Sequence, residues 1–408
     1  MLNRFARLGI SRAMHFNEDR KASLPVCTGG NQRLLYIHVP FCEKLCPYCS
    51  FSRVVFDETL CRTYFAALKR ELLLYRKAGY DFTGIYVGGG TPTILIDELE
   101  ETLALAESTF SIREISVETN PNHLGCKYVD ALKRVGVKRL SVGIQSFNND
   151  LLRAMDRYEK YGSGDQIIRA VQDIIGEFET LNADMIFNFA VQTPSMLDRD
   201  LDILVETGVD QVTYYPLMVS DSTRNLIQKT LGRVDYSRER AFYRRIIKRL
   251  LPDYTSSSVW CFSRKKSMID EYIVKYDEYA GVGSGSFGYL NGICYANTFH
   301  IGEYIERINR GEIPLAASRI FNKRDRIYYD LLMKLFGMEL DLAAMRGKYG
   351  KGAEGLLLIP VLFLYAAGGL RYSNGRFYLT DRGRYYILIM MREFFIAVNN
   401  FRDFCRAG

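Results

Sequence analysis

The sequence predicts an α/β fold: a partial TIM-like (β/α)6 barrel with a C-terminal, mainly helical domain of winged-helix type. Apolar β-like segments alternate with segments of helical periodicity between residues 33 and 217, which is typical of a parallel sheet with crossover helices on its outside. Polar or glycine-rich residues follow the apolar segments, as expected at the active face of such a barrel. Near the C-terminus, the Asn374-Gly375 pair between two short apolar runs indicates a β-hairpin that follows several helices.

The six strands of the barrel are expected at 34–39, 84–87, 114–118, 139–144, 183–189 and 211–217. The helices between them are expected at 59–78, 96–109, 128–135, 165–179 and 198–207. In the C-terminal part, helices are expected at 326–336, 342–348, 355–366 and, after a cap at 380–383, 385–395. We therefore divide the chain into an N-terminal arm (1–32), the barrel (33–235), a barrel extension and substrate-covering segment (236–318) and the winged-helix-like domain (319–408).

Bulk composition favours a cytoplasmic globular protein that acts on a small molecule. The chain has 408 residues, 48% of them hydrophobic and 25% charged, with a net charge of +7 spread along its length. Nine cysteines are an odd and dilute number for a disulfide framework, and no secretory signal is recognisable. The longest apolar run, 355–370, contains Pro360 and is shorter than the ~20 residues that a membrane span needs. No nucleic-acid-binding motif is present.

Three cysteines follow the first strand with the spacing C-x3-C-x2-C: Cys42, Cys46 and Cys49. Each thiolate can hold one iron of a [4Fe–4S] cluster. The fourth iron then stays open, and an open metal position can bind a substrate or cosubstrate. The alternative, a structural zinc site, needs four ligands. The nearest further candidates, Cys61 on an expected helix and His38 on an expected strand, are poorly placed to provide the fourth.

The residues at the other strand ends suit a ligand with both positive and negative groups. The glycine run 88–90 lets backbone amides approach such a ligand closely. Glu118, at a strand end, can bind an amine or sulfonium; the alternative is a surface or helix-capping carboxylate. Gln145 and Asp184 can hold hydroxyl groups. Arg157 can pair bidentately with a carboxylate, or it is an exposed arginine at a helix end.

These motifs together resemble the oxygen-independent coproporphyrinogen III oxidase-like (HemN/HemW-like) branch of the radical S-adenosylmethionine (SAM) enzymes. The resemblance rests on Tyr-x-His-x-Pro-Phe-Cys-x3-Cys-x-Tyr-Cys-x-Phe from Tyr36, on Gly-Gly-Gly-Thr-Pro-Thr (88–93), on Glu-Thr-Asn-Pro (118–121) and on Arg-Leu-Ser-Val-Gly-Ile-Gln-Ser-Phe (139–147). It covers roughly residues 33–290.

The resemblance implies a [4Fe–4S] cluster on Cys42, Cys46 and Cys49, with SAM at the open iron and a reduced flavodoxin- or ferredoxin-type electron donor. Reductive cleavage of SAM would give a 5′-deoxyadenosyl radical, with the three cysteines and Glu118 as the catalytic residues. Many members bind a second SAM, for which Tyr214 is the candidate. The other implied cofactor-binding residues are Tyr36, Phe51, Gly89, Gly90, Thr91, Glu118, Gln145, Arg157 and Asp184.

Departures from the family pattern leave the substrate open. Phe51 stands where the decarboxylating oxidase has a fourth cysteine, and no histidine of the haem-chaperone type follows the stretch 256–264. The favoured function is a radical SAM enzyme that acts on a tetrapyrrole, such as a coproporphyrinogen- or haem-like molecule, or on a similar large substrate. The alternatives are a class C-type methyltransferase or cyclopropanase that uses two SAM molecules on a non-porphyrin natural product, and a haem chaperone. We expect the glycine-dense stretch 279–288 to close over the substrate or the second SAM.

Overall fold

The computed structural model describes residues 17–18, 24–29, 32–221, 223–265 and 272–407. Most of the expected N-terminal arm lies outside these ranges. The domain boundaries proposed from the sequence stay predictions. No helix in the described ranges is long and apolar enough to cross a bilayer.

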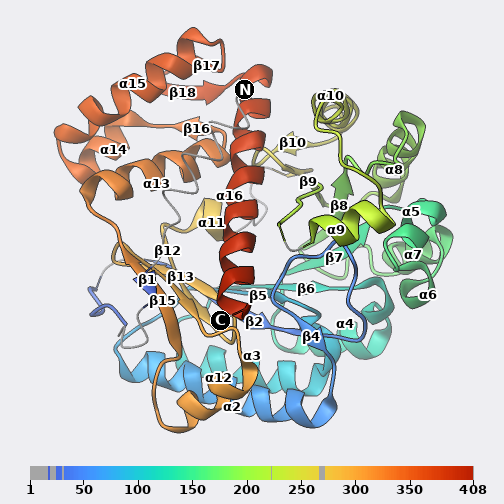
Figure 1. Ribbon diagram of the computed structural model, residues 1–408, viewed down its shortest axis with the longest axis vertical. Helices are drawn as coiled ribbons and strands as arrows, with labels where there is room; N and C mark the ends of the chain where they lie inside the picture. The colour runs from blue at the N-terminus through green and yellow to red at the C-terminus, as the bar shows by residue number, and fades with distance from the viewer. Residues whose placement is uncertain (1–16, 19–23, 30–31, 222, 266–271, 408) are drawn as a thin grey trace.

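Six parallel strands lie side by side in chain order, as expected (Figure 1). They are β2 (Arg33–Val39), β5 (Gly84–Gly89), β6 (Glu114–Thr119), β7 (Arg139–Gln145), β8 (Thr180–Phe187) and β9 (Gln211–Pro216). The crossover helices are α2 (Glu58–Lys77), α3 (Ile96–Thr109), α4 (Cys126–Arg134), α7 (Gly164–Gln172) and α8 (Pro194–Thr207). The helix expected at 165–179 ends early, because the chain turns at Gly176 with a φ of 85°.

The parallel strands belong to a larger sheet of thirteen strands in the described part of the chain. β12 (Glu278–Val282) pairs in parallel with β2, and β13 (Phe287–Leu290), β14 (Ile293–Asn297), β15 (Leu315–Ile320) and β1 (Asn17–Glu18) continue antiparallel. At the other edge, β11 (Cys261–Ser263) and β10 (Thr255–Ser256) follow β9. The fold is thus an open, TIM-like barrel.

Short elements complete the barrel: β3 (Phe41–Cys42), β4 (Val54–Val55), α5 (Asn149–Ala154), α6 (Tyr158–Tyr161), α9 (Arg224–Thr230), α10 (Glu239–Leu250), α11 (Tyr272–Lys275) and α12 (Ile301–Asn309). Two single 3-10 turns follow β5 and β6, at Pro92–Ile94 and Pro121–His123.

The glycine-dense stretch 279–288 packs inside the sheet and does not cover the substrate as expected. A Cβ atom on Gly281 would lie 2.1 Å from the carbonyl oxygen of Phe287, and one on Gly283 would lie 2.5 Å from the carbonyl oxygen of His38. These glycines therefore allow close backbone contact between strands. From the expected covering segment, Tyr272 and Ile273 line the central cavity instead.

The C-terminal part has the expected helices and small sheet. It comprises α13 (Lys323–Phe336), α14 (Leu342–Tyr349), α15 (Gly352–Ala366), β16 (Glu339–Leu340), β17 (Leu370–Ser373), β18 (Arg376–Leu379) and α16 (Asp381–Ala407). Thr380 caps α16 by accepting a hydrogen bond from Gly383 N at 3.1 Å. With 27 residues, α16 is much longer than predicted and runs back across the barrel (Figure 1).

Candidate active site

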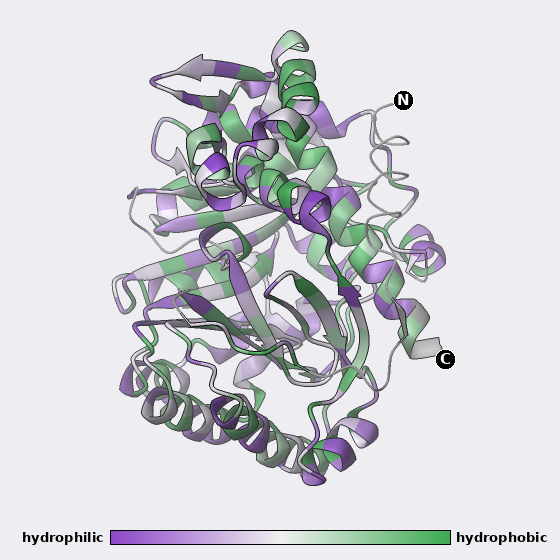
Figure 2. Cartoon of the chain, turned by 90° about the vertical axis from the view of Figure 1, so that its left-hand side faces the viewer, coloured by the Kyte–Doolittle hydropathy of each residue, from purple (hydrophilic) through white to green (hydrophobic). Residues whose placement is uncertain are grey.

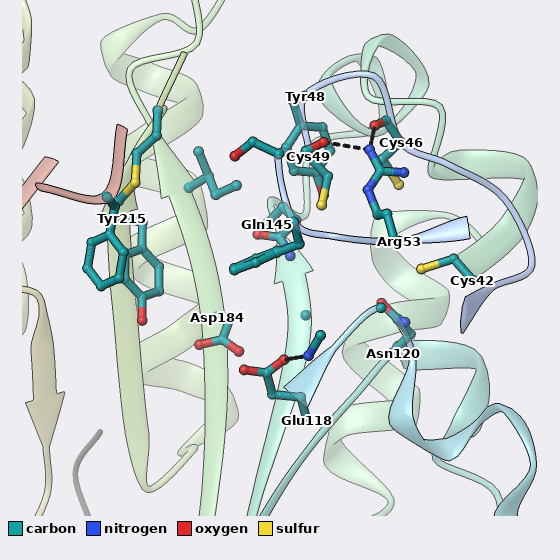
Figure 3. Close-up of a pocket in the computed structure, with 18 of the residues that line it drawn as sticks. Cys42, Cys46, Tyr48, Cys49, Arg53, Glu118, Asn120, Gln145, Asp184 and Tyr215 are labelled. Carbon is teal, nitrogen blue, oxygen red and sulfur yellow. Dashed lines mark hydrogen bonds between the residues drawn. The ribbon is translucent and has the colours of Figure 1, made fainter. Parts of the chain in front are cut away.

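One cavity lies at the carboxyl ends of the parallel strands (Figure 3). Each of the first five parallel strands provides at least one lining residue: Tyr36, Gly89, Glu118, Gln145 and Asp184. The cysteine loop lies beside these strand ends. The polar residues that follow the strands in the sequence therefore meet at one place, as expected for parallel strands of a TIM-like barrel.

Cys42, Cys46 and Cys49 all line the cavity. Their loop is held from two sides: Phe56 N donates to Cys42 O at 2.8 Å, and the Arg53 guanidinium donates to the carbonyl oxygens of Cys46 and Cys49, both at 2.6 Å. Burial raises the pKa of the Cys42 thiol to about 11, and the charge of Cys49 adds to this effect. A bound metal would therefore have to displace the Cys42 proton.

The surroundings of the three thiols fit an anionic, thiolate-bound cluster. Among the buried side-chain atoms of the described residues, Arg53 Nε and Nη1 and Arg157 Nε have no hydrogen-bond partner. Burial lowers the pKa of Arg53, but the charges of all three cysteines outweigh this effect and raise it. Cys46 Sγ lies 3.9 Å from Arg157 Nη1. Two cationic side chains with unpartnered N–H groups, beside three soft thiolate donors, fit a [4Fe–4S] cluster at this place.

A glycine is required where the second strand end meets the cysteine loop. A Cβ atom on Gly90 would lie 2.6 Å from the carbonyl oxygen of Phe41 and 3.0 Å from Cys42 Sγ. Any larger residue would push the cysteine loop away from the strand end. Thr91, next in the chain, is buried behind this loop, where its hydroxyl lies 3.6 Å from Cys42 Sγ and accepts from Asn120 Nδ2 at 2.9 Å. Thr91 does not line the cavity and supports Cys42 instead.

Two partly buried carboxylates, Glu118 and Asp184, point toward one another in the cavity (Figure 3). Glu118 accepts hydrogen bonds from Tyr86 OH at 2.8 Å and Gly89 N at 3.2 Å, and Asp184 accepts from Ser141 Oγ at 2.6 Å. Burial, together with the charge of Asp184, raises the pKa of Glu118 to about 7. Burial also raises the pKa of Asp184. Two facing carboxylates held by neutral donors fit a cationic ligand group.

Gln145 reaches the cavity through an irregularity in its strand. The pairing of β7 with β8 shifts register between Gly143 and Gln145, and Gln145 has a φ of 73°. Such a bulge redirects a side chain, and its strain is typical of functional sites.

Arg157 is buried and not an exposed arginine at a helix end. Its guanidinium donates to Tyr48 OH at 3.2 Å, to Asn120 Oδ1 at 3.3 Å and to the carbonyl oxygen of Gly143. Arg157 thereby joins the cysteine loop to the ends of β6 and β7.

The expectation for Tyr214 does not hold for this cavity. Its side chain is fully buried and packs edge-on against Phe187, with ring centroids 5.9 Å apart. Successive strand residues point to opposite faces, so the next residue, Tyr215, lines the cavity instead (Figure 3). Phe51 lies at the cavity and is half-exposed, with the Arg402 guanidinium 5.6 Å from its ring centroid.

Several lining residues were not expected from the sequence, among them Arg53, Tyr272 and Asn399. Tyr272 stacks on Tyr36 with ring centroids 5.3 Å apart. Asn399, on α16, donates to Ser50 Oγ of the cysteine loop at 2.6 Å. The only signal in the sequence for any of them is the place of Arg53 four residues after Cys49.

The chain is similar to proteins of one family. The model of the Radical SAM superfamily matches residues 36–177. The protein named heme chaperone HemW of Lactococcus lactis subsp. lactis (strain IL1403) is 30% identical over 285 residues, which cover 66% of this chain and 73% of that protein. The protein of the same name from Bacillus subtilis (strain 168) is 28% identical over 86% of this chain and 95% of that protein. Anaerobilin synthase of Escherichia coli O157:H7 is 27% identical over 70% of this chain and 67% of that protein.

Among solved structures, coproporphyrinogen III oxidase (HemN) from Escherichia coli superposes with a TM-score of 0.74 at 20% identity, over 89% of this chain and 90% of that one. This likeness shows that the two proteins share their fold. The sequence relatives and the superfamily match show the family: the chain belongs to the oxygen-independent coproporphyrinogen III oxidase-like (HemN/HemW-like) family of the radical SAM superfamily.

Proposed function

We propose that this chain is a radical SAM enzyme that acts on a tetrapyrrole or a similarly large, partly apolar substrate. Membership of the superfamily implies a [4Fe–4S] cluster and SAM; we assign the cluster to Cys42, Cys46 and Cys49. When bound, the cluster supplies the electron, taken from a flavodoxin- or ferredoxin-type donor, that cleaves SAM to methionine and a 5′-deoxyadenosyl radical. The observation that carries the proposal is that the cysteine loop, two partly buried carboxylates and an apolar wall line the same cavity.

The chain's own residues would bind and orient SAM. Ionised Glu118 and Asp184 face each other and attract the positive groups of SAM, its ammonium and sulfonium. Gly89 and Gly90 line the cavity, and because they lack side chains the strand end can lie directly against His38 and the cysteine loop. The free Nε–H of buried Arg157 is a donor for a carboxylate oxygen. Opposite charges at the two ends of the site would fix the direction in which SAM lies.

The wall opposite the cysteine loop suits an apolar ring system. It is formed by Ile186, Tyr215, Met218, Ile273 and Phe395. Pockets for large ligands combine such apolar and aromatic walls with a few placed polar groups. The names of the relatives refer to haem and coproporphyrinogen, which supports a tetrapyrrole as the substrate class. Phe51 in place of a fourth cysteine weighs against the decarboxylation of coproporphyrinogen as the reaction.

The haem chaperone is the second candidate, because several similar relatives carry that name. In the described part of the chain, however, no histidine lines the cavity. His38 is buried and bonded to Tyr36 OH at 2.9 Å and to the carbonyl oxygen of Ser52 at 2.8 Å. Haem bound in this cavity would therefore need another axial ligand, such as the thioether of Met218.

The methyltransferase or cyclopropanase alternative relied on a second SAM near Tyr214. Since that side chain lies outside the cavity, no specific contact favours this alternative over the other two.

One experiment separates the candidates. The reconstituted protein is incubated anaerobically with dithionite, SAM and either coproporphyrinogen III or haem, and the products are analysed by mass spectrometry. The proposal expects 5′-deoxyadenosine together with a tetrapyrrole of changed mass. Stoichiometric haem binding without 5′-deoxyadenosine would identify a chaperone. S-adenosylhomocysteine would indicate methyl transfer, and loss of SAM cleavage with every substrate would refute the enzyme proposal.

A further inference from the structure

Helix α15 (Gly352–Ala366) turns an apolar face to solvent. Leu358 and Ile359 lie one helical turn before Leu362 and Phe363, so the four residues form one stripe along the helix, here called the α15 face. Their exposed fractions are 56%, 78%, 54% and 65%. Single exposed apolar residues are ordinary on protein surfaces, but a contiguous stripe of four large ones marks an interaction site.

Neither the fold nor the candidate active site explains this face. The opposite side of α15 is the one that packs into the domain, through buried Ala353, Leu357 and Val361. No described residue of α15 lines the cavity. Figure 1 places α15 and the neighbouring β17 at one end of the molecule, far along its longest axis. In Figure 2 this domain, at the top, carries much of the hydrophobic colour on its helices.

Unneutralised basic side chains lie around the same face. Between residues 339 and 384 the sequence has seven Lys or Arg residues and four Asp or Glu residues, a net charge of +3. Arg346, Lys348, Arg376 and Arg384 form ion pairs, whereas no carboxylate of the described residues pairs with Lys351, Arg371 or Arg382. Lys351 precedes α15, and Arg371 lies on β17, which packs against α15; both side chains are exposed. On α15 itself the only charged residue is Glu354, which pairs with Arg346 at 3.5 Å.

We propose that the α15 face docks on an anionic bilayer surface, with the helix lying in the plane of the lipid headgroups. A helix with large apolar side chains on one side and basic residues around it binds at this depth without spanning the bilayer. Exposed Tyr365 and Tyr372 flank the stripe and suit the headgroup level, since a tyrosine has an apolar ring and a polar tip. The basic surroundings favour anionic lipid over an apolar protein surface, because lipid phosphates are their complement in charge.

Vesicle co-sedimentation of the full-length protein tests the proposal. We expect binding to vesicles of phosphatidylcholine with 30% phosphatidylglycerol, much weaker binding to pure phosphatidylcholine, and a decrease in binding as salt is added. The double variant Ile359→Gln/Phe363→Gln removes two exposed side chains, and its partition coefficient should fall at least about tenfold. Ile320→Gln is the matched control: this residue is 77% exposed but lies on β15, and its loss should leave binding unchanged.

The charge contribution is tested separately. Lys351→Gln and Arg371→Gln should each weaken binding to the anionic vesicles about fivefold. Arg244→Gln and Lys248→Gln, in the basic run of α10, should not weaken it. Failure of the wild-type protein to bind anionic vesicles would overturn the proposal, and so would equal binding by the Ile359→Gln/Phe363→Gln variant. A wild-type dimer that this variant converts to a monomer would show that a second copy covers the face, and would also overturn it.

Discussion

The two walls of the cavity differ in how the chain supplies them. The polar wall comes from the cysteine loop and from the ends of five consecutive parallel strands, between Tyr36 and Asp184. The apolar wall is formed by residues from β8, β9, α11 and α16. Ile186 therefore lines the cavity together with residues more than 200 positions later in the chain, such as Phe395. Binding a cluster and SAM requires particular atoms at fixed places, so the residues that do it form a recognisable sequence motif. An apolar wall requires only shape and hydrophobicity, so its residues form no such motif.

The cysteine loop should give the largest effect. Cys46→Ala should lose the visible absorbance of the cluster and nearly all bound iron after anaerobic reconstitution. The two thiolates that remain in the loop, Cys42 and Cys49, cannot replace the missing ligand. Cys126→Ala removes an exposed cysteine of α4 and should keep both. Iron analysis and absorbance spectroscopy measure the outcome, and a full cluster in Cys46→Ala would refute the ligand assignment.

Glu118→Gln tests the carboxylate pair. Replacing one of two charges that hold a buried cation should weaken SAM binding by at least about thirtyfold, as measured by calorimetry. Glu114→Gln is the control on the same strand, since Glu114 bonds Tyr276 OH and Lys275 at the opposite end of β6. Unchanged affinity in Glu118→Gln would show that SAM does not contact this carboxylate.

The pH dependence of binding follows from the raised pKa of Glu118, about 7 against an ordinary 4.5. Between these values the folded protein holds a proton that the unfolded chain has lost, so Glu118 lowers the stability of the SAM-free protein as pH rises through this window. Bound SAM requires the ionised form. Affinity for SAM should therefore rise about tenfold from pH 6 to pH 8 in the wild type, and this rise should be absent in Glu118→Gln. A rise that persists in the variant would assign it to another group.

The contact between α16 and the cysteine loop should give a smaller effect. Asn399→Ala removes the hydrogen bond to Ser50 and should speed the loss of a bound cluster in air by about two- to fivefold, as expected for one hydrogen bond. Asn400→Ala is the matched control, because the neighbouring Asn400 bonds Asp221 and not the loop. Equal rates of bleaching in the two variants would show that α16 does not protect the site.

A further pair of variants separates two adjacent tyrosines. Tyr215→Ala should weaken tetrapyrrole binding about tenfold, since a ring that lines the cavity is lost. Tyr214→Phe should change neither binding nor the melting temperature, because the Tyr214 hydroxyl has no hydrogen-bond partner among the described residues. Fluorescence quenching of a bound porphyrin measures both. Weaker binding by Tyr214→Phe, with unchanged binding by Tyr215→Ala, would instead support Tyr214 as a ligand-binding residue.

The same two tyrosines show where sequence reasoning stops. The positions of the six barrel strands follow from apolar runs and were predicted to within a few residues. The face of each tyrosine was not predicted, because β9 is buried on both faces. Polar Gln211 and Thr213 alternate with apolar Val212, which puts Tyr215 on the polar face of the strand, and the prediction did not use this pattern.

Contacts between distant segments were also beyond prediction. The motifs placed Cys42, Glu118 and Asp184 correctly because neighbouring parallel strands end at one edge. Asn399 and Ser50 are 349 residues apart, and only the length and direction of α16 bring them together. The glycine-dense stretch was misinterpreted for a similar reason: a run of glycines suits close strand packing as well as ligand contact, and the parallel pairing of β12 with β2 decides between them.

The central claim is that the polar wall of this cavity cleaves SAM. The most direct measurement is the amount of 5′-deoxyadenosine formed anaerobically from SAM and dithionite by the cluster-loaded wild type, with Glu118→Gln and Cys46→Ala assayed beside it. We expect 5′-deoxyadenosine from the wild type, far less from Glu118→Gln and none from Cys46→Ala. A cluster-loaded wild type that binds SAM but forms no 5′-deoxyadenosine, with or without a tetrapyrrole, would contradict the claim.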